Sequence, residues 1–262
     1  MKVAIIGAGN MGGVIARGLV AAGALKEEKI AVSNHSRGKL DKLNDEYPDI
    51  YTTTSNTEVI NDANLIILAV KPWHIKQVIE EIAPYVDFSY QMLMSIAAGV
   101  TLADMASWVS EYSHAPILFR AIPNTAILVG ESMTFMSAAG ASDEDITDVT
   151  RLFGSLGRAD VIDENLMVVA TALCSCGIAY VMRYIRAATE GAVELGFKPS
   201  KARDYIMQTM LGAVTLLANT GNNPEVEIDR VTTPGGLTIK GLNAMERAGF
   251  TTSVIEGLKA SV

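Results

Sequence analysis

The stretch Val3-Ala4-Ile5-Ile6-Gly7-Ala8-Gly9-Asn10-Met11-Gly12 decides the fold of this chain. Four consecutive apolar residues predict a buried strand, and the G-x-G-x-x-G spacing that follows leads into helical periodicity at Val14–Ala22. In that context Gly7 permits a tight turn, Gly9 lets the backbone approach a diphosphate, and Gly12 allows close helix–strand packing. The run from Gly7 to Gly12 therefore predicts a dinucleotide site at a helix N-terminus. The alternative is a plain glycine-rich turn.

The rest of the chain first alternates between predicted strands and predicted helices, and its last part is predicted to contain helices only. Further predicted strands are Ile30–Asn34, Leu65–Lys71, Met92–Ala97 and Ile117–Ile122, and the predicted helices between them are Gly38–Glu46, Ile75–Tyr85 and Leu102–Glu111. Nearly continuous apolar strands predict a parallel sheet covered on both faces. Later helices are predicted at Glu164–Leu173, Gly177–Leu195, Lys201–Asn219 and Thr238–Ala248. We expect an α/β protein with a Rossmann dinucleotide-binding domain (1–162) followed by an all-helical domain (163–262).

Composition excludes several classes of protein. The 262 residues are 49% hydrophobic and 19% charged, which predicts a packed globular chain rather than a disordered one. The net charge of −8 argues against nucleic acid as a partner. Two long apolar stretches, Asn165–Met182 and Gln208–Pro224, contain polar interruptions, so we expect helices covered by a subunit interface rather than membrane spans. The apolar run Val3–Ile6 is too short for a signal sequence.

The residues after the second predicted strand indicate which nicotinamide cofactor binds. NAD-binding domains place Asp or Glu there, about 20 residues past the glycines, to bind the ribose 2′-hydroxyl. This chain has Asn34, Ser36 and Arg37 instead, and the next carboxylate is Asp41. Amide and hydroxyl groups beside a cation suit a 2′-phosphate, so we expect NADP(H). The alternative is an ordinary polar turn with a solvated Arg37.

Further motifs resemble the pyrroline-5-carboxylate reductase family. They are Ala69-Val70-Lys71-Pro72, Ser95-Ile96-Ala97-Ala98-Gly99-Val100, Arg120-Ala121-Ile122-Pro123-Asn124-Thr125 and Val231-Thr232-Thr233-Pro234-Gly235-Gly236-Leu237-Thr238. The last is the most specific, because the family carries two glycines, any residue and a threonine there. The resemblance runs nearly end to end. It implies NADPH-dependent reduction of 1-pyrroline-5-carboxylate to L-proline, the last step of proline biosynthesis. It also implies a homodimer through the helical domain with a shared active site, and some members form larger rings.

The resemblance implies particular binding residues as well. Asn56 matches the family's ribose-contacting asparagine, and the matched neighbours of the cofactor are Ala69, Val70, Lys71, Pro72 and Ala97. Glu164 and Thr238 match positions that line the family's substrate pocket. The residues themselves leave other interpretations open, since Lys71 and Pro72 are compatible with the plain end of a strand. Glu164 is compatible with a charge at the start of a helix.

The segment Pro234–Thr238 suits an anionic ligand on chemical grounds. Pro-Gly-Gly before an apolar helical stretch leaves backbone N–H groups free at a helix N-terminus. We expect Gly235, Gly236 and Leu237 to bind the substrate carboxylate, with Thr238 as the catalytic residue beside the ring nitrogen. Hydride would pass from nicotinamide C4 to the C=N carbon, with the proton delivered through Thr238 or water. The alternative is a capped turn in which Thr238 is the N-cap.

One segment departs from the family pattern. Its Ser-Gly-Ser-Gly-Pro-Ala-Tyr appears here as Cys174-Ser175-Cys176-Gly177-Ile178-Ala179-Tyr180, and Arg230 stands where many members have Asn. These changes leave open a related cyclic imine as substrate, or a non-catalytic NADPH-binding protein. A β-hydroxyacid dehydrogenase is a further alternative, with Lys240 and Asn243 as its nearest catalytic pair. We expect Cys174 and Cys176 to be reduced thiols in a cytoplasmic protein, with no metal site.

Overall fold

The computed structural model describes all residues from Met1 to Val262, and it divides into two compact units, Met1–Ser175 and Cys176–Val262. The boundary lies after the expected one at residue 162, because three short helical segments of the first unit follow the last strand. These segments are η4 (Glu164–Leu166), α7 (Met167–Ala170) and the π-helix η5 (Thr171–Cys176), whose last residue opens the second unit.

The first unit is built on one sheet of eight strands in the order β3-β2-β1-β4-β5-β6-β7-β8. Their bounds are β1 (Val3–Ile6), β2 (Ile30–Ser33), β3 (Tyr51–Thr53), β4 (Leu65–Leu68), β5 (Met92–Ser95), β6 (Ile117–Ile122), β7 (Ser132–Ala139) and β8 (Gly157–Val161). The five predicted strands are parallel, as expected, and β3, which was not predicted, is parallel to them. Strand β7 runs antiparallel to β6, and β8 runs parallel to β7. The sheet is therefore mixed, because the loop after β6 returns the chain directly.

Helices cover both faces of this sheet. They are α1 (Gly12–Ala21), α2 (Arg37–Glu46), α3 (Asn56–Val59), α4 (Pro72–Ile82), α5 (Leu102–Val109) and α6 (Asp143–Gly154), with short 3-10 segments η1 (Glu27–Lys29), η2 (Ala83–Tyr85) and η3 (Thr125–Val129). Successive side chains of β1 point to opposite faces of the sheet, and so they belong to two different apolar cores. Val3 and Ile5 join the apolar core that contains residues of α1, α2 and α6, whereas Ala4 and Ile6 join the core that contains residues of α3, α4 and α5.

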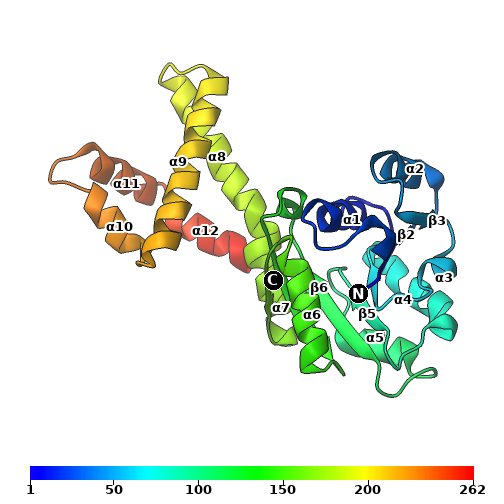
Figure 1. Cartoon of the computed structure of the whole chain (residues 1–262). Coiled ribbons are helices and arrows are strands. Elements are labelled where there is room, and N and C mark those ends of the chain that lie inside the picture. The colour runs from blue at the N-terminus through cyan, green and yellow to red at the C-terminus, as the bar shows by residue number, and fades with distance from the viewer. The chain divides into compact units, whose positions relative to one another are not determined.

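The second unit contains only helices and has almost no interior. They are α8 (Gly177–Glu194), α9 (Pro199–Thr220), α10 (Pro224–Val231), α11 (Leu237–Arg247) and α12 (Phe250–Lys259), with α8 and α9 side by side (Figure 1). Gly221 ends α9 in the left-handed conformation with a φ of 65°, as its position predicts. Ala202 is the only buried residue of these five helices. Large apolar side chains such as Leu195 and Leu211 are exposed.

This exposure bears on the apolar stretches that the sequence singles out. Residues Glu164–Glu194 form one helical stretch of 31 residues, long and apolar enough by length and composition to cross a membrane. Apolar helix faces of this extent are stable only when something covers them. A second protein chain is one such cover.

Candidate functional site

The glycine turn after β1 has the geometry of a phosphate-binding loop. Gly7 has a φ of 108°, and a Cβ added there would lie 2.7 Å from the carbonyl oxygen of Ala69. A Cβ at Gly12 would lie 2.0 Å from the carbonyl oxygen of Gly7, whereas a Cβ at Gly9 would meet no atom within 4 Å. Gly7 and Gly12 therefore allow close packing, and Gly9 leaves the outer side of the turn open.

The same turn offers donors for an anion. The N–H groups of Gly9, Asn10, Met11 and Gly12 donate to no protein acceptor, and Met11 at the N-cap of α1 makes no side-chain capping bond. Free N–H groups and the positive end of the helix dipole suit a diphosphate. The turn also lies where the strand order reverses between β1 and β4, which is where doubly wound sheets bind ligands. The residues present therefore fit a dinucleotide.

Asn34 connects this turn to the segment after β2. Its Oδ1 accepts a hydrogen bond from the N–H of Ala8 at 3.2 Å, and its Nδ2 donates to the carbonyl oxygen of Ser36 at 2.9 Å. Asn34 is buried, so its amide positions the two loops. Ser36 is the N-cap of α2 without a capping bond, and Arg37 and Lys39 are exposed in the first turn. The open N-terminus of α2, with the exposed Arg37 in its first turn, suits an anion such as a phosphate.

Asn56 also has partners within the protein. Its Oδ1 accepts from the hydroxyl of Ser33 at 2.8 Å, and its Nδ2 donates to Oε2 of Glu81 at 3.0 Å. These contacts fix the start of α3 beside the end of β2. The predicted ribose contact would have to use the remaining lone pairs or exchange one of these bonds, and it stays a prediction.

The other predicted cofactor neighbours follow β4 and β5 at the same edge of the sheet. Ala69 and Val70 are half-buried, and Ala69 limits the space at both Gly7 and Gly12. Lys71 is the N-cap of α4 and Pro72 its first residue, and both are exposed. Ala97 is buried, and its N–H donates to the hydroxyl of Ser95 at 3.2 Å. Because β1, β2, β4 and β5 are parallel, their carboxyl ends bring these segments to one edge.

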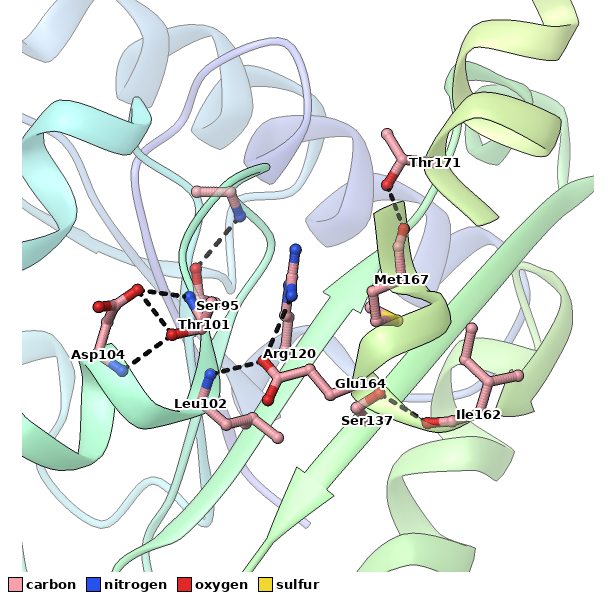
Figure 2. Close-up of polar contacts among 11 residues, drawn as sticks. Ser95, Thr101, Leu102, Asp104, Arg120, Ser137, Ile162, Glu164, Met167 and Thr171 are labelled. Carbon is pink, nitrogen blue, oxygen red and sulfur yellow. Dashed lines mark hydrogen bonds and ion pairs between the residues drawn. The ribbon is translucent and has the colours of Figure 1, made fainter. Parts of the chain in front are cut away.

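Glu164 makes two contacts within the first unit. Its Oε1 accepts a hydrogen bond from the N–H of Leu102 at 2.7 Å and lies 3.3 Å from Nη1 of Arg120 (Figure 2). It is the first residue of η4, yet its carboxylate caps the N-terminus of α5. Glu164 therefore is a charge at a helix start, as the alternative interpretation has it, and it also stabilises the start of α5. Its place in a substrate pocket remains a prediction.

Asp104 belongs to the same cluster. Its carboxylate accepts from the hydroxyl and the N–H of Thr101 at 2.7 and 3.0 Å, completing a capping box at the start of α5. These hydrogen bonds from Thr101, and to a smaller extent the nearby charge of Arg120, hold the pKa of Asp104 below its usual range. The N-terminus of α5 thus gathers two carboxylates around one buried guanidinium.

The Pro234–Thr238 segment has open donors at the start of α11. Gly235 has a φ of 74°, and Gly236 is the N-cap without a side-chain capping bond. The N–H groups of Leu237 and Thr238 have no protein acceptor, and the Thr238 hydroxyl is exposed and makes no hydrogen bond. The alternative that Thr238 is an N-cap is therefore wrong. The segment can bind an anion through its backbone, with one hydroxyl alongside.

The segment at residues 174–178, whose sequence differs from the family pattern, begins in an unusual conformation. Residues Thr171–Cys176 form a π-helix, and Nδ2 of Asn124 donates to the carbonyl oxygen of Cys174 at 3.4 Å. Both cysteines are free thiols. Burial raises the pKa of the Cys174 thiol, which lowers its thiolate fraction at neutral pH. In α10, Arg230 lies 2.7 Å from Glu227 in an ion pair.

Two family descriptions match this chain in sequence order. Residues 2–99 match NADP oxidoreductase coenzyme F420-dependent, and residues 164–262 match pyrroline-5-carboxylate reductase dimerisation. Pyrroline-5-carboxylate reductase 2 of Dictyostelium discoideum is 36% identical, covering 99% of this chain and 90% of its own. The Escherichia coli (strain K12) pyrroline-5-carboxylate reductase is 34% identical, covering 98% and 94%. The chain belongs to the pyrroline-5-carboxylate reductase family.

Solved structures of the family agree with the fold. The Plasmodium falciparum pyrroline carboxylate reductase with NADP bound has a TM-score of 0.89 at 26% identity, covering 100% of this chain and 95% of its own. The Coxiella burnetii pyrroline-5-carboxylate reductase has a TM-score of 0.90 at 29% identity, covering 99% and 95%. The expected Rossmann domain, helical domain and NADP-dependent oxidoreductase class are confirmed, and the β-hydroxyacid dehydrogenase alternative is wrong.

Sequence reasoning missed two polar residues of this edge. Arg120 has no predicted role of its own, although a charge inside the apolar run Ile117–Ile122 is itself a signal. The partner of Asn56, Glu81, comes from the end of α4, and no local spacing connects the two.

Proposed function

We propose that this chain reduces 1-pyrroline-5-carboxylate to L-proline with NADPH. In this reaction NADPH would supply a hydride to the C=N carbon and the ring nitrogen would gain a proton, which gives L-proline and NADP⁺. The observation that carries the proposal is a match to reductases over 98–99% of the chain, which includes both the glycine turn and the Pro234–Thr238 segment. The cofactor supplies the hydride, and the chain's residues supply binding and orientation.

The first unit would hold the cofactor. The free N–H groups from Gly9 to Met11 would bind the diphosphate, and the exposed start of α2 with Arg37 would bind the 2′-phosphate. Asn34 would keep the two loops at a fixed separation through its bonds to Ala8 and Ser36. The segment Ile96–Val100 after β5 would lie beside the nicotinamide, where the half-buried and buried apolar groups of Ile96 and Ala97 exclude water.

The start of α11 would hold the substrate. Its free N–H groups would bind the carboxylate without a buried cation, and the Thr238 hydroxyl would hydrogen bond to the ring nitrogen. A hydroxyl can hold the protonated imine in place or pass a proton from water to the nitrogen. In this proposal Glu164 borders the pocket through its outer carboxylate oxygen, since Oε1 is occupied by Leu102 and Arg120.

The helical unit would form the homodimer with a shared active site. Its near absence of buried residues, together with the dimerisation match over 164–262, supports a second copy rather than a membrane as the cover. We place the protein in the cytoplasm, a location supported by its two free thiols. Light scattering on purified protein tests the assembly, because a dimer and a larger ring differ in mass by a whole multiple.

A related cyclic imino acid is the second candidate substrate. The observation that favours it is the altered segment from Cys174 to Ile178, whose π-helical start distinguishes it from a plain helix. The test is NADPH oxidation with 1-pyrroline-5-carboxylate, a six-membered cyclic imino acid and a 2-keto acid in parallel. Turnover greatest on the five-membered imine supports the proposal. Preference for the larger ring supports the second candidate, and NADPH binding without turnover on any of them contradicts both.

A further inference from the structure

Arg120 is a buried charge for which the proposed chemistry has no use. It lies on β6, its side chain is 5% exposed, and its register partners are Ser95 on β5 and Ser137 on β7. Its Nη1 lies 3.3 Å from Oε1 of Glu164, while its Nε is buried without any hydrogen-bond partner. A guanidinium so covered cannot touch a ligand through Nε.

Stability alone is a poor explanation for this arrangement. Replacing a buried ion pair with apolar side chains of similar volume is often neutral or stabilising. An orphaned buried N–H group adds a further cost. A buried charge that lowers stability in the middle of an apolar strand therefore indicates another role, which is to hold a second group in place.

What Arg120 holds is the end of the β5–α5 connection. Glu164 Oε1 is shared between Arg120 and the N–H of Leu102, the first residue of α5 (Figure 2). At the other end of the connection, the Ser95 hydroxyl accepts from the N–H of Ala97. The six residues Ile96–Thr101 are therefore fixed at both ends, and the Arg120 backbone lies level with Ser95 in the neighbouring strand.

We propose that Arg120 is a positioning residue for hydride transfer, acting through Glu164 on the segment Ile96–Thr101. The proposal rests on the function proposed above, in which this segment borders the nicotinamide. Without the guanidinium, Glu164 loses its ion partner and its carboxylate is free to turn to solvent, since its side chain is 30% exposed. The N–H of Leu102 then loses its acceptor, and this end of the segment is held only by the capping box of Thr101 with Asp104.

The test combines one measurement on the protein alone with one on the enzyme. For Arg120→Met, amide hydrogen exchange in the absence of cofactor is expected to rise about tenfold across residues 96–102 and to stay unchanged in β1 and β4. The kcat with 1-pyrroline-5-carboxylate is expected to fall about tenfold, while the Kd for NADPH changes less than about threefold. This split is expected because, in the proposed function, the turns after β1 and β2 bind the diphosphate and the 2′-phosphate.

Two variants of Glu164 separate the charge from the hydrogen bond. Glu164→Gln keeps an acceptor for Leu102 and is expected to retain most of the exchange protection, whereas Glu164→Ala is expected to behave like Arg120→Met. Both remain informative if Arg120→Met fails to fold. The matched control is Arg151→Met, which breaks the exposed ion pair with Asp148 and is expected to leave exchange and kcat unchanged.

Two results would overturn the proposal. One is unchanged exchange at residues 96–102 in both Arg120→Met and Glu164→Ala. The other is a loss of activity that follows a general loss of protection across the first unit, which is the behaviour of a purely structural residue. Absence of wild-type turnover would contradict the proposed function instead, and the exchange measurement would still report on the contact between Arg120, Glu164 and Leu102.

Discussion

Asn34 accepts a hydrogen bond from the backbone N–H of Ala8, and this contact joins the glycine turn after β1 to the loop after β2. The two loops are the predicted sites of the cofactor's diphosphate and of its 2′-phosphate. The distance between these two groups in a dinucleotide is set by the cofactor itself. A fixed separation between the loops therefore suits a ligand in which one ribose links the two groups.

Arg37→Ala is expected to discriminate between the two cofactors. Loss of a charge-assisted hydrogen bond to the 2′-phosphate should raise the KM for NADPH roughly tenfold and leave the KM for NADH nearly unchanged. Asn34→Ala is the matched comparison, since it loosens both loops and should weaken both cofactors. Steady-state kinetics with each cofactor measure this, and equal losses for both cofactors in Arg37→Ala would contradict the assignment of Arg37.

Gly12→Ala is expected to lower the stability of the fold, whereas Gly9→Ala is expected to lower the affinity for NADPH. A Cβ at Gly12 would lie 2.0 Å from a backbone oxygen, so Gly12→Ala should destabilise the fold by about 1–3 kcal/mol. A Cβ at Gly9 meets no protein atom within 4 Å, so the melting temperature of Gly9→Ala should stay within about 2 °C of the wild type. Its NADPH affinity should nevertheless fall at least about tenfold. Calorimetric unfolding and titration separate the two effects, and normal NADPH affinity in Gly9→Ala would place the diphosphate elsewhere.

Thr238→Ala is expected to lower kcat/KM for the imine by about tenfold or more, which corresponds to ~1.4 kcal/mol of transition-state stabilisation. NADPH binding should be unchanged, because the residue lies in the second unit. Thr238→Ser retains the hydroxyl and should keep most of the activity. Normal turnover by the alanine variant would remove Thr238 from the mechanism.

The pKa of Asp104, which the hydrogen bonds from Thr101 lower, predicts an acid-sensitive contribution to stability. A carboxyl group with a lowered pKa in the folded state stabilises the fold above its unfolded pKa of about 3.9. The contribution is lost as the pH falls through the folded value. Asp104→Asn should therefore be less stable than the wild type at pH 7, with the difference shrinking below about pH 4. Thermal unfolding from pH 7 to pH 3 measures this, and a constant difference would contradict it.

The thiols at Cys174 and Cys176 are expected to be structural. Because burial raises the pKa of Cys174, its alkylation by iodoacetamide should need a higher pH in the folded protein than in the unfolded chain. Cys176→Ser restores the residue of the family pattern and should keep or raise activity. Bound zinc, or activity that follows reversible oxidation of the pair, would show a functional role instead.

The sequence best predicts those strands whose consecutive residues are nearly all apolar and buried. Strands β1 and β6 have the bounds expected from their apolar runs. Strand β7 was missed because it buries Ser132, Thr134 and Ser137, whose hydroxyls are satisfied by hydrogen bonds rather than by apolar contact. Helix α6 is not among the predicted elements, although it has two kinds of local signal, the capping box of Ser142 with Asp145 and buried apolar residues at helical spacing, Val149, Leu152 and Phe153.

The candidate site likewise contains a local feature that the sequence predicts and a long-range contact that it does not. The glycine turn is local, so spacing alone predicts it. The contact between Arg120 and Glu164 joins residues 44 positions apart in the sequence, and neither residue's neighbours indicate the other. Long-range pairs depend on strand order, and the antiparallel β7 that completes this order was itself not expected.

The contrast between a first unit with two buried cores and a helical unit with one buried residue sets an order of events during synthesis. Because residues 1–175 contain both cores, we expect them to fold while the ribosome is still adding the remainder. Helices α8 to α12 would stay incompletely folded until a second chain arrives, so their maturation becomes a bimolecular step that slows on dilution. Chains translated from neighbouring ribosomes on one messenger would meet soonest, which makes pairing during translation an advantage for this architecture.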